Sequence, residues 1–86
     1  MKYKINKGFI IQKVGESSTI FDGEKSELYT FNKTATLIFE KIKSGWESAK
    51  IIEYLSKFYS IKKEEAEKDF NEFVSELIKS KILSKK

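Results

Sequence analysis

Four carboxylates recur at helical spacing in the last third of the chain, at Glu65, Asp69, Glu72 and Glu76. Side chains three and four residues apart lie on one face of a helix, so these form an acidic strip in which Asp69 and Glu72 are neighbours. Such a pair could exchange protons with a substrate, but no His, Cys or glycine-rich phosphate loop accompanies it. The strip is either a solvated helix face or the border of a groove that suits a basic or amide-rich peptide.

The absence of His and Cys limits the chemistry that this chain could perform. It removes thiolate nucleophiles, disulfides, imidazole bases and the usual ligands of zinc, haem and iron–sulfur clusters. We therefore expect no catalytic residues, no metal and no cofactor. No apolar run reaches the roughly 20 residues of a membrane helix, and the start "MKYKINKGF" lacks the apolar core of a signal peptide, so the expected location is the cytoplasm without membrane attachment.

Length and composition predict one domain over residues 1–86, because 40% apolar and 14% aromatic residues supply one core and not two. The net charge of +4 arises from interleaved basic and acidic residues, with the basic excess at the two ends. Nucleic-acid-binding proteins tend to concentrate positive charge on one face. The charge is thus weak evidence for a nucleic-acid partner.

The first third of the chain alternates as strands do. Three short runs, "FIIQKV", "STIF" and "LYTF", are separated by "GES" and "DGEKSE", which predicts an antiparallel meander. Asp22 and Gly23 form a strong turn signal, since glycine accepts a positive φ and Asp can bond to nearby backbone N–H groups. The second hairpin loop is expected at residues 22–26.

Helical periodicity begins directly after the third strand. Asn32 is the expected N-cap of a first helix and Gly45 its C′ residue. A second helix is predicted at residues 48–60 with Ser48 as its cap, and a third at about 62–81 with a poor cap at Lys62. One broad apolar stripe covers the third helix: Ala66, Phe70, Phe73, Val74, Leu77 and Ile78. The tail "ILSKK" supplies one last apolar pair and is then expected to fray.

Strands followed by helices predict an α+β domain, a three-stranded antiparallel sheet and then a three-helix bundle. The third strand is an edge of this meander, and "LYTF" contains no charge that would block pairing. An extended peptide could add to it as a further strand. Dimerisation through the same edge, or simple hydration, are the alternatives.

Several segments resemble the pyrroloquinoline quinone biosynthesis protein D (PqqD) family, the recognition element of ribosomally made, modified peptides. "GFIIQKVGESSTIFD" is similar to the family's first hairpin, "LYTFNKTATLIFEKIKSG" to its signature at the start of the first helix, and "EEAEKDFNEFVSELIKSKIL" to its last helix. The resemblance implies a winged-helix-like fold and a non-catalytic adaptor. Such an adaptor binds the leader of a precursor peptide as a strand and presents it to a separate modifying enzyme, such as a radical S-adenosylmethionine maturase or a leader peptidase.

The same resemblance implies where the peptide would bind, beside the third strand and against the third helix. Carried onto this sequence, the positions are Leu28, Tyr29, Thr30, Phe31, Asp69, Phe70, Phe73 and Leu77. Two other functions stay open. A winged-helix nucleic-acid-binding protein would share the fold, although the acidic strip argues against a helix seated among phosphates. The other is a structural subunit or a homodimer paired through the strand edge.

Overall fold

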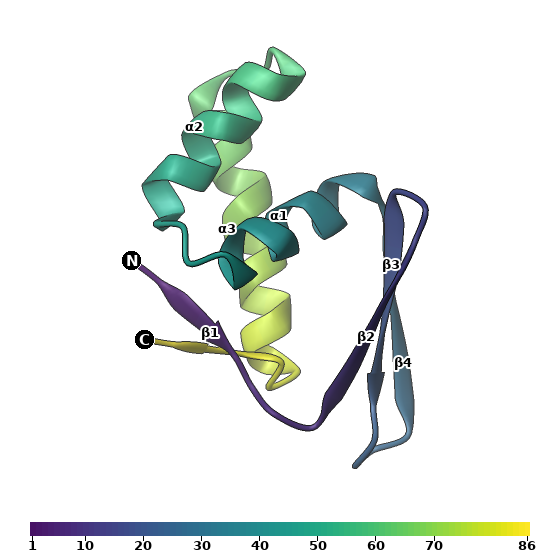
Figure 1. Cartoon of the computed structure of the whole chain (residues 1–86). Coiled ribbons are helices and arrows are strands. Elements are labelled where there is room, and N and C mark those ends of the chain that lie inside the picture. Colours follow the sequence, from purple (N-terminus) through teal and green to yellow (C-terminus); the bar gives the residue numbers. More distant parts are fainter.

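An antiparallel sheet stands beside three helices in the computed structural model, which describes residues 1–86 (Figure 1). The strands β2 (Phe9–Val14), β3 (Ser17–Asp22) and β4 (Glu27–Phe31) pair in the order β2-β3-β4. The helices α1 (Lys33–Lys43), α2 (Ser48–Tyr59) and α3 (Lys63–Lys79) follow in the sequence. The predicted α+β fold, a three-stranded sheet followed by three helices, is confirmed.

Two further strands tie the ends of the chain together, where the sequence had predicted fraying. β1 (Tyr3–Ile5) pairs antiparallel with β5 (Leu83–Lys85), and the backbone N–H of Asn6 donates to the carbonyl of Ile82 over 2.8 Å. Ile82 and Leu83 are buried in the core. The prediction of a frayed tail was wrong, because the partner strand of this apolar pair lies almost the whole chain away.

The β3–β4 loop lies where the Asp22-Gly23 signal placed it, but glycine is not the residue that turns it. The Asp22 carboxylate accepts hydrogen bonds from the backbone N–H groups of Glu24 and Lys25, at 3.0 and 3.2 Å. Ser26, with φ of 56°, adopts the left-handed conformation, while Gly23 does not. Gly23 was predicted to supply the positive φ of this loop, and this prediction was wrong. The Asp22 carboxylate holds the backbone at the start of the loop, and Ser26, the last loop residue, adopts the positive φ.

The helix ends agree with the sequence at three positions and differ at one. The Asn32 side chain accepts from the backbone N–H of Ala35 at 2.9 Å, so strand β4 passes into α1 through one residue, and Gly45 has the positive φ of a C′ glycine. Ser48 is not a cap: Glu47 occupies that position, and the Ser48 hydroxyl donates to the Met1 carbonyl at 2.7 Å. Lys62 provides no side-chain cap for α3, as predicted.

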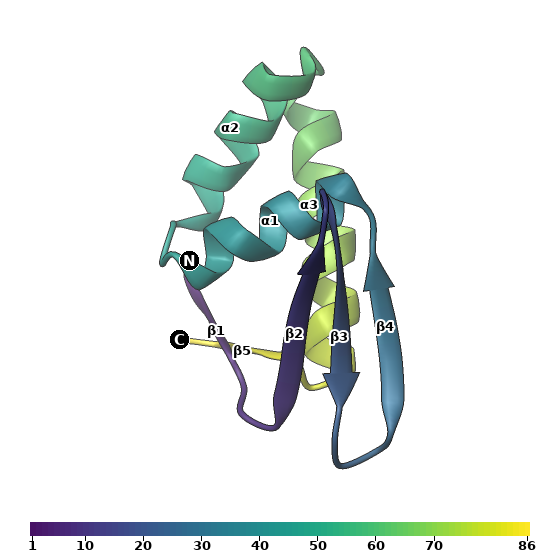
Figure 2. The ribbon, with the colours of Figure 1, turned by 45° about the vertical axis from the view of Figure 1, so that its right-hand side comes forward.

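The core lies between the sheet and the helices. α3 passes behind the three-stranded sheet in the view of Figure 2. α3 contributes four fully buried residues: Ala66, Phe70, Val74 and Leu77. Phe73 is only half-buried and Ile78 is exposed. The apolar stripe of the sequence is thus wider than the core, and the Phe73 side of it is open to a ligand.

Candidate functional site

A groove runs between strand β4 and helix α3, with a volume of about 450 Å³. The strand and the helix run in opposite directions along it, as Figure 2 shows. The groove is lined by Leu28, Tyr29, Thr30, Phe31, Asn32, Ala35, Phe73, Glu76, Leu77 and Ser80. A shallower hollow of about 310 Å³ continues it past Phe73 to Asp69.

The β4 backbone beside the groove has hydrogen-bonding groups without a partner strand. The N–H of Gly23 donates to the carbonyl of Gly8, so Gly8 and Gly23 are a hydrogen-bonded pair of the β2–β3 ladder. Bonded and non-bonded pairs alternate in antiparallel sheets, which makes Thr19 and Phe21 bond to β2. Their opposite residues in β4 are Thr30 and Leu28.

Thr30 and Leu28 therefore point their N–H and C=O groups away from β3, toward the free edge. No strand other than β3 pairs with β4, and residues 27–31 make no backbone–backbone hydrogen bond outside the sheet. Unpaired edge groups of this kind are a template for another strand. The local sequence leaves them open because "LYTF" contains neither Pro nor charge.

Phe73 forms the apolar wall of the groove on the helix side. Its ring lies edge-on against Phe31, with ring centroids 5.2 Å apart, and Leu77 is 3% exposed beneath it. Ala35, at the start of α1, also lines the groove, and its small side chain occupies little of it. Tyr29 and Phe31 face the same side of the sheet as these groups, since residues two apart in a strand share a face.

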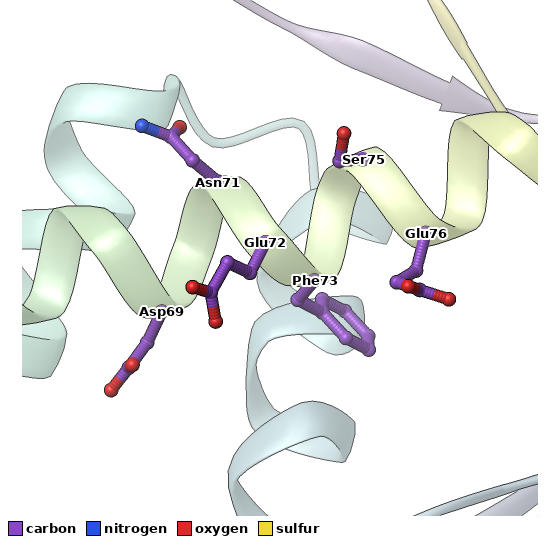
Figure 3. A pocket seen from close by; sticks show the side chains of 6 residues that line it. All are labelled: Asp69, Asn71, Glu72, Phe73, Ser75 and Glu76. Carbon is purple, nitrogen blue, oxygen red and sulfur yellow. The ribbon is translucent and has the colours of Figure 1, made fainter.

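Three carboxylates surround Phe73 on the exposed side of α3, as Figure 3 shows: Asp69, Glu72 and Glu76. They border a hollow of about 700 Å³ that also includes Asn71 and Ser75. The four ion pairs of the protein involve other acidic residues. Three of the four members of the predicted acidic strip thus lie beside the apolar groove, whereas Glu65 does not line it, and none of the three forms an ion pair with a lysine of this chain.

At the other end of the groove, Tyr29 is hydrogen-bonded to a neighbouring carboxylate. The Tyr29 hydroxyl donates to the Glu27 carboxylate over 2.8 Å. This bond, with some desolvation, raises the pKa of Tyr29 above its ordinary value. Tyrosine is neutral at physiological pH even with its ordinary pKa, and this shift moves its ionisation further from that range, so the groove has no ionised tyrosine at its wall.

Metal-binding and membrane-spanning features have little structural support. No three His, Cys, Asp or Glu side chains lie close enough together to hold a metal ion. None of the three helices combines the length and the apolar character that a bilayer crossing requires.

Residues 18–83 match the family model described as coenzyme PQQ synthesis protein D (PqqD). The chain belongs to the PqqD family. The matched region includes all but the first residue of β3, all of β4 and all three helices, so it contains both walls of the groove. No curated protein matches the sequence.

Two solved structures share this PqqD fold. Lasso peptide synthetase B1 complexed with the leader peptide superposes with a TM-score of 0.90 at 20% identity, over 98% of this chain and 99% of that chain. TbiB1 in complex with the TbiA(beta) leader peptide superposes with a TM-score of 0.88 at 15% identity, over 98% and 95% of the two chains. These similarities show that the fold is shared over nearly the whole length.

The groove brings together six of the eight residues that the family resemblance implied: Leu28, Tyr29, Thr30, Phe31, Phe73 and Leu77. Asp69 lies in the adjoining hollow. Phe70 lies elsewhere, because it is 1% exposed and its ring packs near Tyr3 with centroids 6.4 Å apart. A residue in this position stabilises the fold and cannot contact a ligand in the groove.

Four groove residues were not among the predicted site positions. Glu76 belonged to the acidic strip but was not assigned to the site, and Asn32 had been assigned only to helix capping. Ala35 and Ser80 gave no functional signal. Ser80 lines the groove because α3 ends there, and sequence patterns locate helix ends only to within a few residues.

Proposed function

We propose that this protein is a non-catalytic adaptor that binds the leader segment of a ribosomally made precursor peptide. The leader adds as a strand to the free edge of β4, beside α3, and the remainder of the precursor is presented to a separate modifying enzyme. The observation that carries this proposal is the outward-facing backbone of Leu28 and Thr30 next to an apolar groove. Membership of the PqqD family and the fold shared with two leader-bound B1 proteins support it.

Strand addition suits this site because it separates affinity from selectivity. Backbone groups of β4 bind any extended peptide, and side-chain contacts in the groove select among peptides. Leader residues opposite Tyr29 and Phe31 would share their face of the sheet and enter the groove beside Phe73 and Leu77. Residues opposite Leu28 and Thr30 would face outward.

The experiment uses the leader of a short precursor encoded next to this protein. Binding is measured by fluorescence anisotropy, and the site is located by backbone amide exchange of the 15N-labelled protein. We expect the amides of Leu28 and Thr30 to become protected on binding. Protection elsewhere, with these two unchanged, would refute strand addition at β4. Mass measurement with and without peptide tests whether a homodimer uses the same edge, because the leader would then dissociate it.

A separate modifying enzyme needs a second surface, and the outer face of the sheet provides one. Ile10, Phe21 and Leu28 lie directly across from one another on neighbouring strands and are 65%, 37% and 64% exposed. The row lies on the face of the sheet away from the helices, and although Leu28 also borders the groove, Ile10 and Phe21 do not line it and stay exposed when it is filled. Contiguous apolar surface of this kind marks protein-binding sites. Whether the enzyme is a radical S-adenosylmethionine maturase or a leader peptidase is decided by co-purification with each.

Nucleic acid is not favoured as the partner. α3 carries six carboxylates and three lysines, so its net charge of −3 opposes the +4 of the whole chain. A helix in the major groove lies among phosphates and is normally basic. We expect no salt-dependent binding to duplex DNA of random sequence.

A further inference from the structure

The charges along the groove specify which leader residues it selects. No lysine lines the groove, the hollow at Asp69 or the hollow around Phe73. Every ionisable side chain that does line them is a carboxylate, apart from the protonated Tyr29: Asp69, Glu72 and Glu76. A carboxylate without a counter-ion beside an apolar surface favours a cationic ligand group.

The spacing of these carboxylates along α3 is similar to the spacing of residues on one face of an added strand. Helix residues rise about 1.5 Å each, so Glu76 lies about 4.5 Å and Asp69 about 6 Å along α3 from Phe73, on opposite sides of it. Leader residues that share a face are about 6.6 Å apart. A residue opposite Phe31 would contact Phe73, and its neighbours at two residues before and after would reach the two carboxylates.

We infer that the groove selects a leader with an apolar residue flanked at both −2 and +2 by lysine or arginine. The apolar residue packs on Phe73 and Phe31, and the two cations pair with Asp69 and Glu76, with Glu72 between them. This inference rests on the proposed function, because it assumes a strand added to β4. It adds the chemical class of the ligand.

The net charge of the protein makes the inference sharply testable. A chain of net charge +4 attracts acidic peptides through its overall field. A preference for basic peptides must therefore come from the local carboxylates of α3. The groove predicts a preference for basic peptides, whereas the overall charge predicts a preference for acidic ones.

Three labelled synthetic nonapeptides serve as probes, Ser-Thr-X-Thr-Phe-Thr-X-Thr-Ser with X as Lys, Gln or Glu. We expect Kd to rise from Lys to Gln to Glu, by about two- to fivefold for each side chain exchanged, and the differences to shrink in high salt. In the triple variant D69N/E72Q/E76Q the order should reverse. The matched control E64Q/E65Q/E67Q changes the net charge equally on the same helix, away from the groove, and should retain the wild-type order.

The outcomes separate this inference from the proposed function. Equal affinity for all three peptides, with protected amides at Leu28 and Thr30, would overturn the charge selectivity and leave strand addition intact. A Lys preference that survives in D69N/E72Q/E76Q would also overturn it. If no nonapeptide and no natural leader protects the two amides, the proposed function fails and the inference fails with it.

Discussion

Phe73 and Phe70 are three residues apart on α3, and the structure predicts opposite consequences for their truncation. Phe73 is half-buried at the groove, whereas Phe70 is 1% exposed in the core. Replacing a fully buried Phe by Ala costs about 3–5 kcal/mol of folding free energy. A domain of this length has about 4–13 kcal/mol in total. Phe70→Ala should therefore lose a large part of its stability.

Phe73→Ala should lose less stability and much more binding. Half of a Phe burial is worth about 1–1.5 kcal/mol, and the edge-on contact with Phe31 adds about 0.5–1.5 kcal/mol. A loss of about 2 kcal/mol leaves the variant mostly folded in a domain of ordinary stability. If Phe73 anchors the leader, its removal costs at least about 2 kcal/mol of binding, which raises Kd about 30-fold.

Urea unfolding followed by circular dichroism measures the folding free energy of each variant. Fluorescence anisotropy with the leader measures its Kd. Phe70→Leu provides a variant that keeps most of the core volume if Phe70→Ala does not fold. Its Kd, corrected for the folded fraction, should equal that of the parent. The reasoning is refuted if Phe73→Ala binds within twofold of the parent, or if Phe70→Leu loses affinity while folded.

Three further predictions concern the strand edge, its hydrogen bond and the paired termini. Thr30→Pro removes an outward N–H and should abolish leader binding with little change in circular dichroism, while Thr30→Ala should bind normally; equal binding by both would argue against pairing at this position. Glu27→Gln should lower the pKa of Tyr29 toward its ordinary value in an ultraviolet titration. In the parent, the Tyr29–Glu27 hydrogen bond contributes fully to stability below about pH 10, and this contribution is lost as the pH rises through the raised pKa of Tyr29 in the folded state. Leu83→Ala should cost about 2–5 kcal/mol in urea unfolding, because Leu83 is 1% exposed; a cost below 1 kcal/mol would mean that β5 frays in solution.

Local signals in the sequence predicted the elements whose stabilising contacts are also local. Asn32 bonds to a backbone group three residues away, and Gly45 closes α1 through its own φ. Such contacts depend on neighbouring residue types, so the direct passage from strand to helix could be recognised in advance. The three strands of the meander were predictable for the same reason, since each pairs with the next one along the chain.

Non-local contacts explain the errors. Leu83 belongs to a strand because Ile5 lies opposite it, and Ser48 is the first residue inside α2, where its hydroxyl donates to the distant Met1 carbonyl while Glu47 holds the cap position. The difference between Phe70 and Phe73 is of the same kind. Both belong to one apolar stripe, but Phe70 packs in the core, with Tyr3 among its neighbours, whereas Phe73 lies against Phe31 at the groove.

The short free edge also limits what strand addition alone can achieve. Leu28 and Thr30 offer four backbone groups, and a net hydrogen bond contributes about 0.5–1.5 kcal/mol, so the ladder supplies about 2–6 kcal/mol. A Kd of 1 μM requires about 8 kcal/mol after the loss of translational and rotational freedom has been overcome. Side chains in the groove must supply the difference. Selectivity for one leader is therefore determined mainly by α3, by the apolar surface at Phe73 and the carboxylates beside it.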